Sequence, residues 1–316
     1  MKSKQVVGIV IAVLVFVIAG AAGVASASTL NSSLTTFSSL TRAADAEPAS
    51  NLAVIDISGT IGASSSDGYD HEFILGYIED LTNSYENMGI LLHIDSPGGR
   101  VYETDEVYLA LENYKNLTGR PVYAYAESYM ASGAYYIACA ADLIAANRNS
   151  WVGSIGVYIS TVNYKGLFDT LGIRPEYIKS GENKAMGNGY DELTEEQYAI
   201  YQGLVDESFE QFLDIVCSSR TYSREEALPI CDGRIYTAAQ GLENGLIDRI
   251  YSYEEFETLC LEECGASNIY ERVYVSDDWM SYFFGEVEAL IPKSEAQILL
   301  EQLEQDESGV PMYYAG

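Results

Sequence analysis

The chain has 316 residues and is 48% hydrophobic, which is enough apolar material for a domain with a sizeable core. It carries 17 Lys and Arg residues against 47 Asp and Glu residues, a formal net charge of −30. This balance excludes nucleic acid as an expected partner, because phosphate backbones are bound by basic patches. The same charge predicts a soluble, self-repelling surface.

The N-terminal segment is strongly apolar. Lys2 and Lys4 precede an unbroken apolar run over residues 6–25. About 20 such residues span a bilayer, and lysines on the amino side place that end in the cytoplasm. Residues 25–27, Ala-Ser-Ala, also match a signal-peptidase cleavage site. We therefore expect residues 1–28 to be a transmembrane anchor or a signal sequence, and the length of the run favours a retained anchor.

This segment also predicts where the protein is located. A retained anchor gives a single-pass protein of the cell membrane whose remaining chain is extracytoplasmic. Residues 29–50 are rich in Ser, Thr and Ala, with few large apolar side chains. Such a composition is typical of a linker, so we expect a stalk between the membrane and the first folded domain.

From residue 52 onward, strand and helix patterns alternate. Short apolar runs bounded by turn residues predict buried strands over residues 52–58, 90–94, 121–126 and 142–146. Helical periodicity predicts one helix in 70–87, with Ile74, Tyr77, Ile78, Leu81 and Tyr85 on one face. A second is expected in 104–117, with Val107, Leu111 and Tyr114 on one face. The alternation indicates an α/β fold with a parallel sheet and crossover helices.

Two capping boxes predict further helices. Thr194 and Gln197 begin a long one, whose apolar stripe is expected to face the core: Tyr198, Tyr201, Val205, Phe209, Phe212 and Val216. Thr237 and Gln240 begin another, which Gly245 would end. We expect one folded domain over residues 51–275 and a C-terminal tail over residues 276–316.

The chain has five cysteines and two histidines. Cys139 is expected to be a buried thiol, whereas Cys217, Cys231, Cys260 and Cys264 could form disulfides in an oxidising compartment. Their spacing gives no metal site, and no cofactor is predicted. His93 lies in a predicted strand and is expected to be structural, and His71 lies at a helix start and is expected to be solvated. The chain has no H-E-x-x-H, G-x-S-x-G or P-loop motif.

Ser132 lies in "MASGAYY", where small residues precede a predicted helix. Small residues here permit either tight packing or a nucleophile at a helix start. A serine nucleophile needs a base, and lysine serves in Ser-Lys enzymes. The lysine pKa must then fall from ~10.4 to near neutrality, which costs ~4 kcal/mol and is within reach of burial. Lys165, Lys179 and Lys184 are the candidates downstream.

An oxyanion hole is predicted beside this serine. Gly98 and Gly99 follow the predicted strand in "HIDSPGGR", where backbone N–H groups can face a ligand without a Cβ in the way. Ligands in open α/β sheets favour the carboxyl ends of strands. The N–H of Gly133, at the start of the helix after Ser132, is the second expected donor.

The motifs taken together resemble a known family. "LLHIDSPGGRVYETDEVYLAL", "ASGAYYIACAAD", "NSWVGSIGV", "LGIRPEYIKSGENKAMG" and "DGRIYTAAQGLENGLID" are similar, in order and spacing over roughly residues 50–250, to signal peptide peptidase A. This is a family of membrane-anchored serine proteases. The resemblance implies a ClpP/crotonase-like α/β fold with repeated β-β-α units. It also implies cleavage of remnant signal peptides by a Ser-Lys dyad, without a cofactor or metal.

The resemblance assigns roles to individual residues. Ser132 matches the nucleophile and Lys184 the general base, with Lys179 as a rival that we expect to be structural. Gly98, Gly99 and Gly133 match the oxyanion hole. Ser154, in "VGSIGV", would orient the lysine amine or be a plain turn residue. The chain departs from the family pattern at Ala134, where a second glycine is usual, and at Ala185, where an aspartate is usual.

The resemblance also implies partners. Extended peptides with small or apolar side chains are the expected substrates. Family members form rings, about eight copies in short forms, so we expect a homo-oligomer at the membrane in which the lysine reaches a neighbouring subunit's serine. The alternatives are a non-proteolytic membrane scaffold of the same fold and, less favoured, acyl-CoA chemistry.

The C-terminal sequence raises one further hypothesis. The chain ends in "SGVPMYYAG". An extended segment of this kind could lie in the substrate groove, or it could be a disordered end. If it occupies the groove, deleting residues 305–316 should raise peptidase activity.

Overall fold

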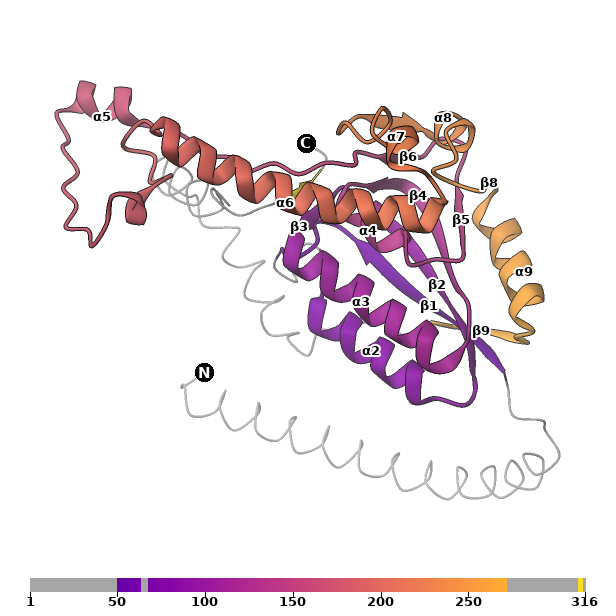
Figure 1. Ribbon diagram of the computed structural model, residues 1–316. Helices are drawn as coiled ribbons and strands as arrows, with labels where there is room; N and C mark the ends of the chain where they lie inside the picture. Colours follow the sequence, from indigo (N-terminus) through magenta and orange to yellow (C-terminus); the bar gives the residue numbers. More distant parts are fainter. Residues whose placement is uncertain (1–49, 64–67, 272–311, 315–316) are drawn as a thin grey trace, which may run out of the picture. The chain divides into compact units, whose positions relative to one another are not determined.

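The computed structural model describes residues 50–63, 68–271 and 312–314 (Figure 1). The predicted anchor over 1–28, the stalk up to residue 49 and most of the tail lie outside these residues. Among the helices of the described ranges, none combines the length and apolar character needed to cross a bilayer.

The described residues form an eight-stranded sheet and a small two-stranded one. The large sheet contains β1 (Asn51–Ser58), β2 (Asn87–Ser96), β4 (Val122–Ala131), β5 (Leu143–Ala146), β6 (Trp151–Gly153), β7 (Ile235–Thr237), β8 (Arg249–Ile250) and β9 (Asn268–Glu271). The strand order is β7-β6-β4-β2-β1-β9, with β5 pairing with both β4 and β8. All pairs are parallel except β6–β7. The predicted α/β fold with a largely parallel sheet is confirmed.

The described helices are α2 (His71–Asn83), α3 (Val101–Thr118), α4 (Gly133–Ala138), α5 (Lys165–Leu171), the 3-10 helix η2 (Glu182–Ala185), α6 (Glu195–Arg220), α7 (Arg224–Ala227), α8 (Ala238–Glu243) and α9 (Tyr253–Cys264). The predicted helices are present, and α5, η2, α7 and α9 were not predicted. Both predicted capping boxes are present: the hydroxyls of Thr194 and Thr237 accept from the backbone N–H groups of Gln197 and Gln240. Side-chain caps satisfy N–H groups that a helix start leaves without a partner.

Helices cover both faces of the sheet (Figure 1). Alternate residues of β1 point to opposite faces, as the period of a strand requires. Ala53, Ile55 and Ile57 belong to the core shared with α2, α3 and α4. Leu52 and Val54 belong to the core on the other face, where α9 contributes Phe256 and Cys260. Burial on both faces explains why the strand sequences are continuous apolar runs.

Two predicted helix faces are partly wrong. Tyr85 lies beyond the end of α2 and is 80% exposed. In α6, the predicted stripe is buried only from Phe212 onward, and Tyr198 is 63% exposed. The first half of α6 and α5 extend beyond the sheet in Figure 1. We call residues 158–204 the arm. The two helix faces were mispredicted because helical periodicity shows that a face is apolar but does not show what covers it.

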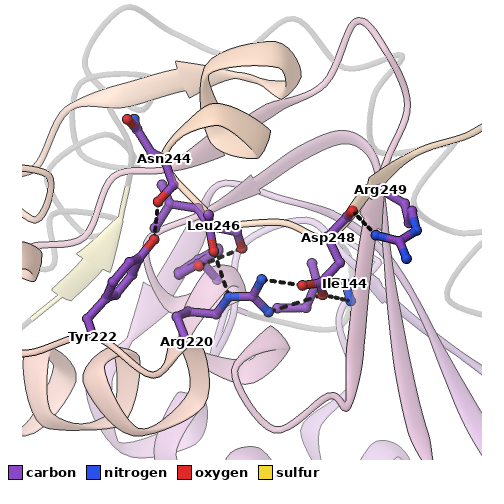
Figure 2. A network of polar contacts seen from close by, with 9 residues as sticks. Ile144, Arg220, Tyr222, Asn244, Leu246, Asp248 and Arg249 are labelled. Carbon is purple, nitrogen blue, oxygen red and sulfur yellow. Dashed lines mark hydrogen bonds and ion pairs between the residues drawn. The ribbon is translucent and has the colours of Figure 1, made fainter.

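The other end of α6 is fixed to the sheet by Arg220 (Figure 2). Its guanidinium contacts both carboxylate oxygens of Asp248, at 2.5 and 3.1 Å, and its Nε donates to the carbonyl of Gly245 at 2.8 Å. Asp248 in turn accepts from the backbone N–H of Ile144, in β5, at 2.8 Å. A two-pronged pair of this kind fixes direction as well as distance, so it anchors the C-terminal end of α6.

All five cysteines are free thiols. Cys139 is 5% exposed, as predicted, and burial raises its pKa to about 12. The disulfides considered for Cys217, Cys231, Cys260 and Cys264 are not formed in the structure. The predicted core thiol is confirmed, and the fold is held together without a disulfide between these four residues.

His93 is a structural histidine, as predicted. Its Nδ1 lies 2.9 Å from Asp56 and its Nε2 lies 3.4 Å from Glu127. Its ring packs 4.7 Å from that of Tyr253, measured between ring centroids. Burial lowers the pKa of His93, but the hydrogen bond to Asp56 and the charges of Asp56, Glu127 and Asp95 outweigh it, so the net pKa is raised.

We expect this histidine to make stability depend on pH. Because the folded-state pKa is raised, protonated His93 stabilises the fold below its unfolded pKa of ~6.5, and this contribution is lost as the pH rises through the folded value. Urea unfolding of wild type and His93→Gln at several pH values measures the difference. The excess stability of wild type should be largest below about pH 6.5 and should shrink as the pH rises above that value. A difference in unfolding free energy between the two proteins that does not change with pH would contradict stabilisation by protonated His93.

Candidate active site

Three neighbouring strands end at one edge of the sheet and place the predicted site residues there. In the order β6-β4-β2, these strands are followed by Ser154, Ser132 and the turn that contains Gly98. All three are parallel, so their carboxyl ends coincide. This edge is where open α/β sheets bind ligands.

Ser132 joins β4 to α4 with a strained backbone. Its φ is 53° and its ψ is −119°, a conformation that non-glycine residues rarely adopt. The strain is held by two hydrogen bonds: its N–H donates to the carbonyl of Gly153 at 2.7 Å, and its carbonyl accepts from the N–H of Tyr136 at 3.0 Å. In α/β-hydrolases the serine nucleophile occupies a strained strand-to-helix turn of this kind.

The hydroxyl of Ser132 is buried without a hydrogen-bond partner in the described structure. The residue is 1% exposed. A buried polar atom without a partner costs free energy, and such atoms are rare outside functional sites. Among the described residues of the chain, no group therefore lies within hydrogen-bond reach of this hydroxyl.

Ser154 directly follows the neighbouring strand β6, at the same height in the sheet as Ser132. Ala131 of β4 pairs with Gly153 of β6, so Ser132 and Ser154 directly follow paired residues. Ser154 is 6% exposed and also has a positive φ, of 50°. A cavity of about 380 Å³ begins at this residue, lined by apolar side chains such as Ile155, Val157 and Phe209 and by the carboxylates of Asp206 and Asp232. This cavity has room for an apolar side chain.

The two glycines of the predicted oxyanion turn have different surroundings. The N–H of Gly98 donates to the Oγ of Ser96 at 3.2 Å. Gly99 lies in β3 (Gly98–Arg100). One edge of β3 is hydrogen-bonded to the backbone of Ile61: the Gly98 carbonyl accepts from the Ile61 N–H, and the Arg100 N–H donates to the Ile61 carbonyl, both at 2.9 Å. Since N–H groups alternate in direction along a strand, the Gly99 N–H points to the opposite edge of β3.

That opposite edge is paired with the C-terminal strand β10 (Met312–Tyr314). The pairing is antiparallel, with Tyr313 opposite Gly99. β10 also contacts α4, the helix that begins directly after Ser132. The tail backbone therefore occupies the edge of β3 to which the Gly99 N–H points.

We expect the tail to compete with substrate. Deleting residues 305–316 should raise the rate of peptide hydrolysis severalfold at low substrate concentration, because the edge of β3 is then open. Tyr313→Pro should act in the same direction, since proline lacks the N–H that a strand pair uses. Tyr313→Ala, which keeps that N–H, is the control. Equal rates for the deleted and full-length chains would contradict the competition.

The candidate lysines all lie in the arm. Lys165 pairs with Asp169 at 2.8 Å, and Lys179 pairs with Glu182 at 3.1 Å. Lys184, in η2, is exposed, and its side chain makes no ion pair or hydrogen bond with any residue that the structure describes. Of these three lysines, only Lys184 has no carboxylate partner among the described residues. One chain alone does not bring Lys184 to the hydroxyl of Ser132.

Neither histidine takes the place of the lysine. His93 is bound to Asp56 and Glu127. The prediction that His71 is solvated is wrong, because its Nε2 lies 2.9 Å from Glu106 and its Nδ1 lies 2.9 Å from the hydroxyl of Tyr69. A Ser-His pair with Ser132 is therefore absent from the described residues.

Sequence reasoning missed two residues that shape the site. Ser96 accepts from Gly98 and donates to the carbonyl of Gly59 at 2.6 Å, which fixes the turn. A serine two residues before a glycine is a known turn signal and could have indicated this role. Ile61 holds β3 through its backbone alone, so no feature of its side chain could have indicated it.

Comparison with known proteins matches the chain to one peptidase family. Residues 115–264 match the model of Peptidase family S49. A putative signal peptide peptidase SppA of Enterococcus faecium is 30% identical over 85% of this chain and 83% of that protein. A putative protease of Synechocystis sp. is 37% identical, and the match covers 52% of this chain and 59% of that protein.

Among solved structures, a mutant of a membrane-bound stomatin-specific protease aligns with 66% of this chain and 84% of that one. Its sequence identity is 16% and its TM-score is 0.42. The family assignment rests on the sequence matches, above all on the Enterococcus faecium relative, which is aligned over most of both chains. The chain therefore belongs to peptidase family S49, a family of serine proteases.

Proposed function

We propose that this chain is a serine endopeptidase with Ser132 as nucleophile and Lys184 as general base. The observation that carries the proposal is the buried, strained Ser132, whose hydroxyl has no partner in the described structure and lies at the carboxyl edge of the sheet. Lysine acts as a base when an apolar site keeps its amine neutral. Closure of a site around Lys184 would supply that burial.

The reaction proceeds by acyl transfer. Lys184 accepts the proton of the Ser132 hydroxyl as its oxygen attacks the peptide carbonyl. The tetrahedral oxyanion accepts hydrogen bonds from the N–H groups of Gly99 and Gly133, while Gly98 shapes the turn. The lysine then passes the proton to the leaving amine, and water hydrolyses the acyl-enzyme in the same way. Ser154, beside Ser132, orients the lysine amine.

The lysine comes from a neighbouring copy of the chain in a ring of about eight. The exposed arm supports this assembly, because α5 has no buried residue and apolar side chains such as Leu167, Leu171 and Ile178 face solvent. Exposed apolar surface of this kind marks an interface. Docking of the arm would bury both this surface and Lys184.

The substrates are extended peptides at the outer surface of the cell membrane, among them remnants of signal peptides. Pairing of β10 with β3 supports an extended backbone, and the cavity beside Ser154 supports an apolar side chain. The apolar run over residues 6–25 supports an anchor that keeps the enzyme close to such peptides. We also propose that the fold is of the ClpP/crotonase type.

A fluorophosphonate probe tests the nucleophile. The full chain should be labelled at Ser132, as mapped by mass spectrometry, and Ser132→Ala should not be labelled. Lys184→Ala should be labelled at least about a hundredfold more slowly, because the serine has lost its base. A non-proteolytic scaffold would show no labelling of Ser132, and that result would refute the proposed function.

A further inference from the structure

Three polar side chains meet between α3, α4 and α6. The hydroxyl of Tyr136 donates to Oδ1 of Asp105 at 2.5 Å. The side-chain amide of Gln211 donates to the same hydroxyl at 2.7 Å and to Asp105 Oδ1 at 3.0 Å. We call Asp105, Tyr136 and Gln211 the polar node. Each member comes from a different helix.

Each of these helices carries one part of the proposed machinery. Asp105 lies in α3, which directly follows the glycine strand β3. Tyr136 lies in α4, and its N–H bonds to the carbonyl of Ser132. Gln211 lies in α6, whose first half belongs to the arm. The node therefore joins the oxyanion turn, the nucleophile and the arm.

The segment around Lys184 is fixed to the far end of α6. The amide of Asn183 donates to Glu196 at 3.0 Å. The hydroxyl of Tyr201 contacts the carbonyl of Met186 at 3.3 Å. Lys184 lies between these two attachments, so its position follows the direction of α6.

The length of α6 makes its direction sensitive to the node. Residues 195 and 211 are separated by roughly 24 Å at 1.5 Å per residue. A tilt of about 2–3° about Gln211 therefore moves the far end by about 1 Å, and a 1 Å misplacement can cost ~100-fold in rate. Buried Phe212, Leu213 and Val216 hold α6 against the core. Apolar packing is non-directional, whereas hydrogen bonds depend on angle.

We propose that the polar node positions the arm, so that Lys184 is presented at the angle that catalysis requires. Gln211 and Tyr136 are positioning residues: they act through α6 and α4 and touch no substrate. This inference rests on the proposed function, because it assigns the node a part in that reaction.

Paired substitutions in the full-length chain test the node. Gln211→Met removes the amide at similar length and should lower kcat at least about tenfold while KM stays within about twofold. Gln211→Lys restores a donor to Asp105 and should recover most of kcat. Ser218→Ala is the control, because Ser218 lies in α6 outside the arm and its hydroxyl donates to the carbonyl of Asp214 within the same helix, at 2.8 Å.

A second pair of substitutions, Tyr136→Phe and Tyr135→Phe, distinguishes loss of the node from the general effect of removing a tyrosine hydroxyl from α4. Tyr136→Phe keeps the ring but removes both node hydrogen bonds of the Tyr136 hydroxyl, leaving the bond from Gln211 to Asp105, and should lower kcat in the same direction as Gln211→Met. Tyr135→Phe removes the neighbouring buried hydroxyl, which donates to the carbonyl of Leu246 at 2.7 Å, and should leave kcat within about twofold of wild type. Unchanged kcat in Tyr136→Phe and Gln211→Met, or an equal loss in both controls, would overturn the inference.

A distance measurement gives a readout besides activity. Leu109 in α3 and Tyr198 in the arm are 55% and 63% exposed. Spin labels introduced there as unnatural amino acids should give a broader distance distribution in Gln211→Met than in wild type or Ser218→Ala. An unchanged width would overturn the inference. The distance distribution could instead broaden in Gln211→Met while the wild-type chain shows no hydrolysis that depends on Ser132. That result would refute the proposed function and leave the coupling between the node and the arm intact.

Discussion

An equimolar mixture of Ser132→Ala and Lys184→Ala chains should regain peptidase activity that neither variant has alone. Each variant should be inactive, because one lacks the nucleophile and the other lacks the base. In a mixed ring, the arm of a Ser132→Ala chain can present its intact Lys184 to the intact Ser132 of a neighbouring Lys184→Ala chain. A full dyad then forms from two damaged subunits.

The expected amount follows from random assembly. A site is complete only when its serine comes from one variant and its lysine from the other, so about a quarter of the sites should work. A dyad formed within one chain would give no activity at any mixing ratio. Hydrolysis of a fluorogenic apolar peptide, measured after the variants are dissociated and reassembled together, distinguishes the two arrangements.

Two controls make the result specific. A chain carrying both Ser132→Ala and Lys184→Ala should rescue neither single variant. Lys179→Ala should be active by itself, since Lys179 is paired with Glu182 and is not the expected base. Loss of activity in Lys179→Ala together with a fully active Lys184→Ala would reverse the assignment of the base.

The sequence predicted the sheet and the elements that deliver the site. Continuous apolar runs, such as that of β1, are typical of strands covered on both faces, and the structure covers them with α2, α3 and α9. Capping boxes at Thr194 and Thr237 are local signals and were found where predicted. Ser132 and Gly99 follow neighbouring strands, so parallel pairing alone brings them to one edge.

The remaining features depend on contacts that a local pattern does not contain. The apolar stripe of α6 predicted core burial, yet Tyr198 is exposed because the core formed by the described residues reaches α6 only from Phe212 onward. His71 was expected to be solvated, but its partner Glu106 lies 35 residues away and comes close only when α2 packs against α3. The distinction between Gly98 and Gly99 depends on the side chain of Ser96 and the backbone of Ile61.

Gly99→Ala should remove most of the activity and some of the stability. A Cβ on Gly99 would lie 2.0 Å from the carbonyl oxygen and 2.6 Å from the nitrogen of Ile61. Neither backbone can move freely, because Ile61 is hydrogen-bonded to Gly98 and Arg100 on either side. The strand β3 must therefore shift and weaken these bonds, at about 1–3 kcal/mol of unfolding free energy. A displaced Gly99 N–H should also lower kcat by about 100-fold.

Gly76→Ala is the matched control for this substitution. Gly76 lies within α2, and no atom lies within 4 Å of the Cβ that alanine would add. Alanine there should raise the free energy of unfolding by about 0.5–1 kcal/mol and leave kcat unchanged. Urea unfolding and peptide hydrolysis of both variants give the comparison. If Gly99→Ala kept wild-type kcat and stability, β3 would not be the rigid edge that holds the oxyanion, and the donor would have to come from α4 alone.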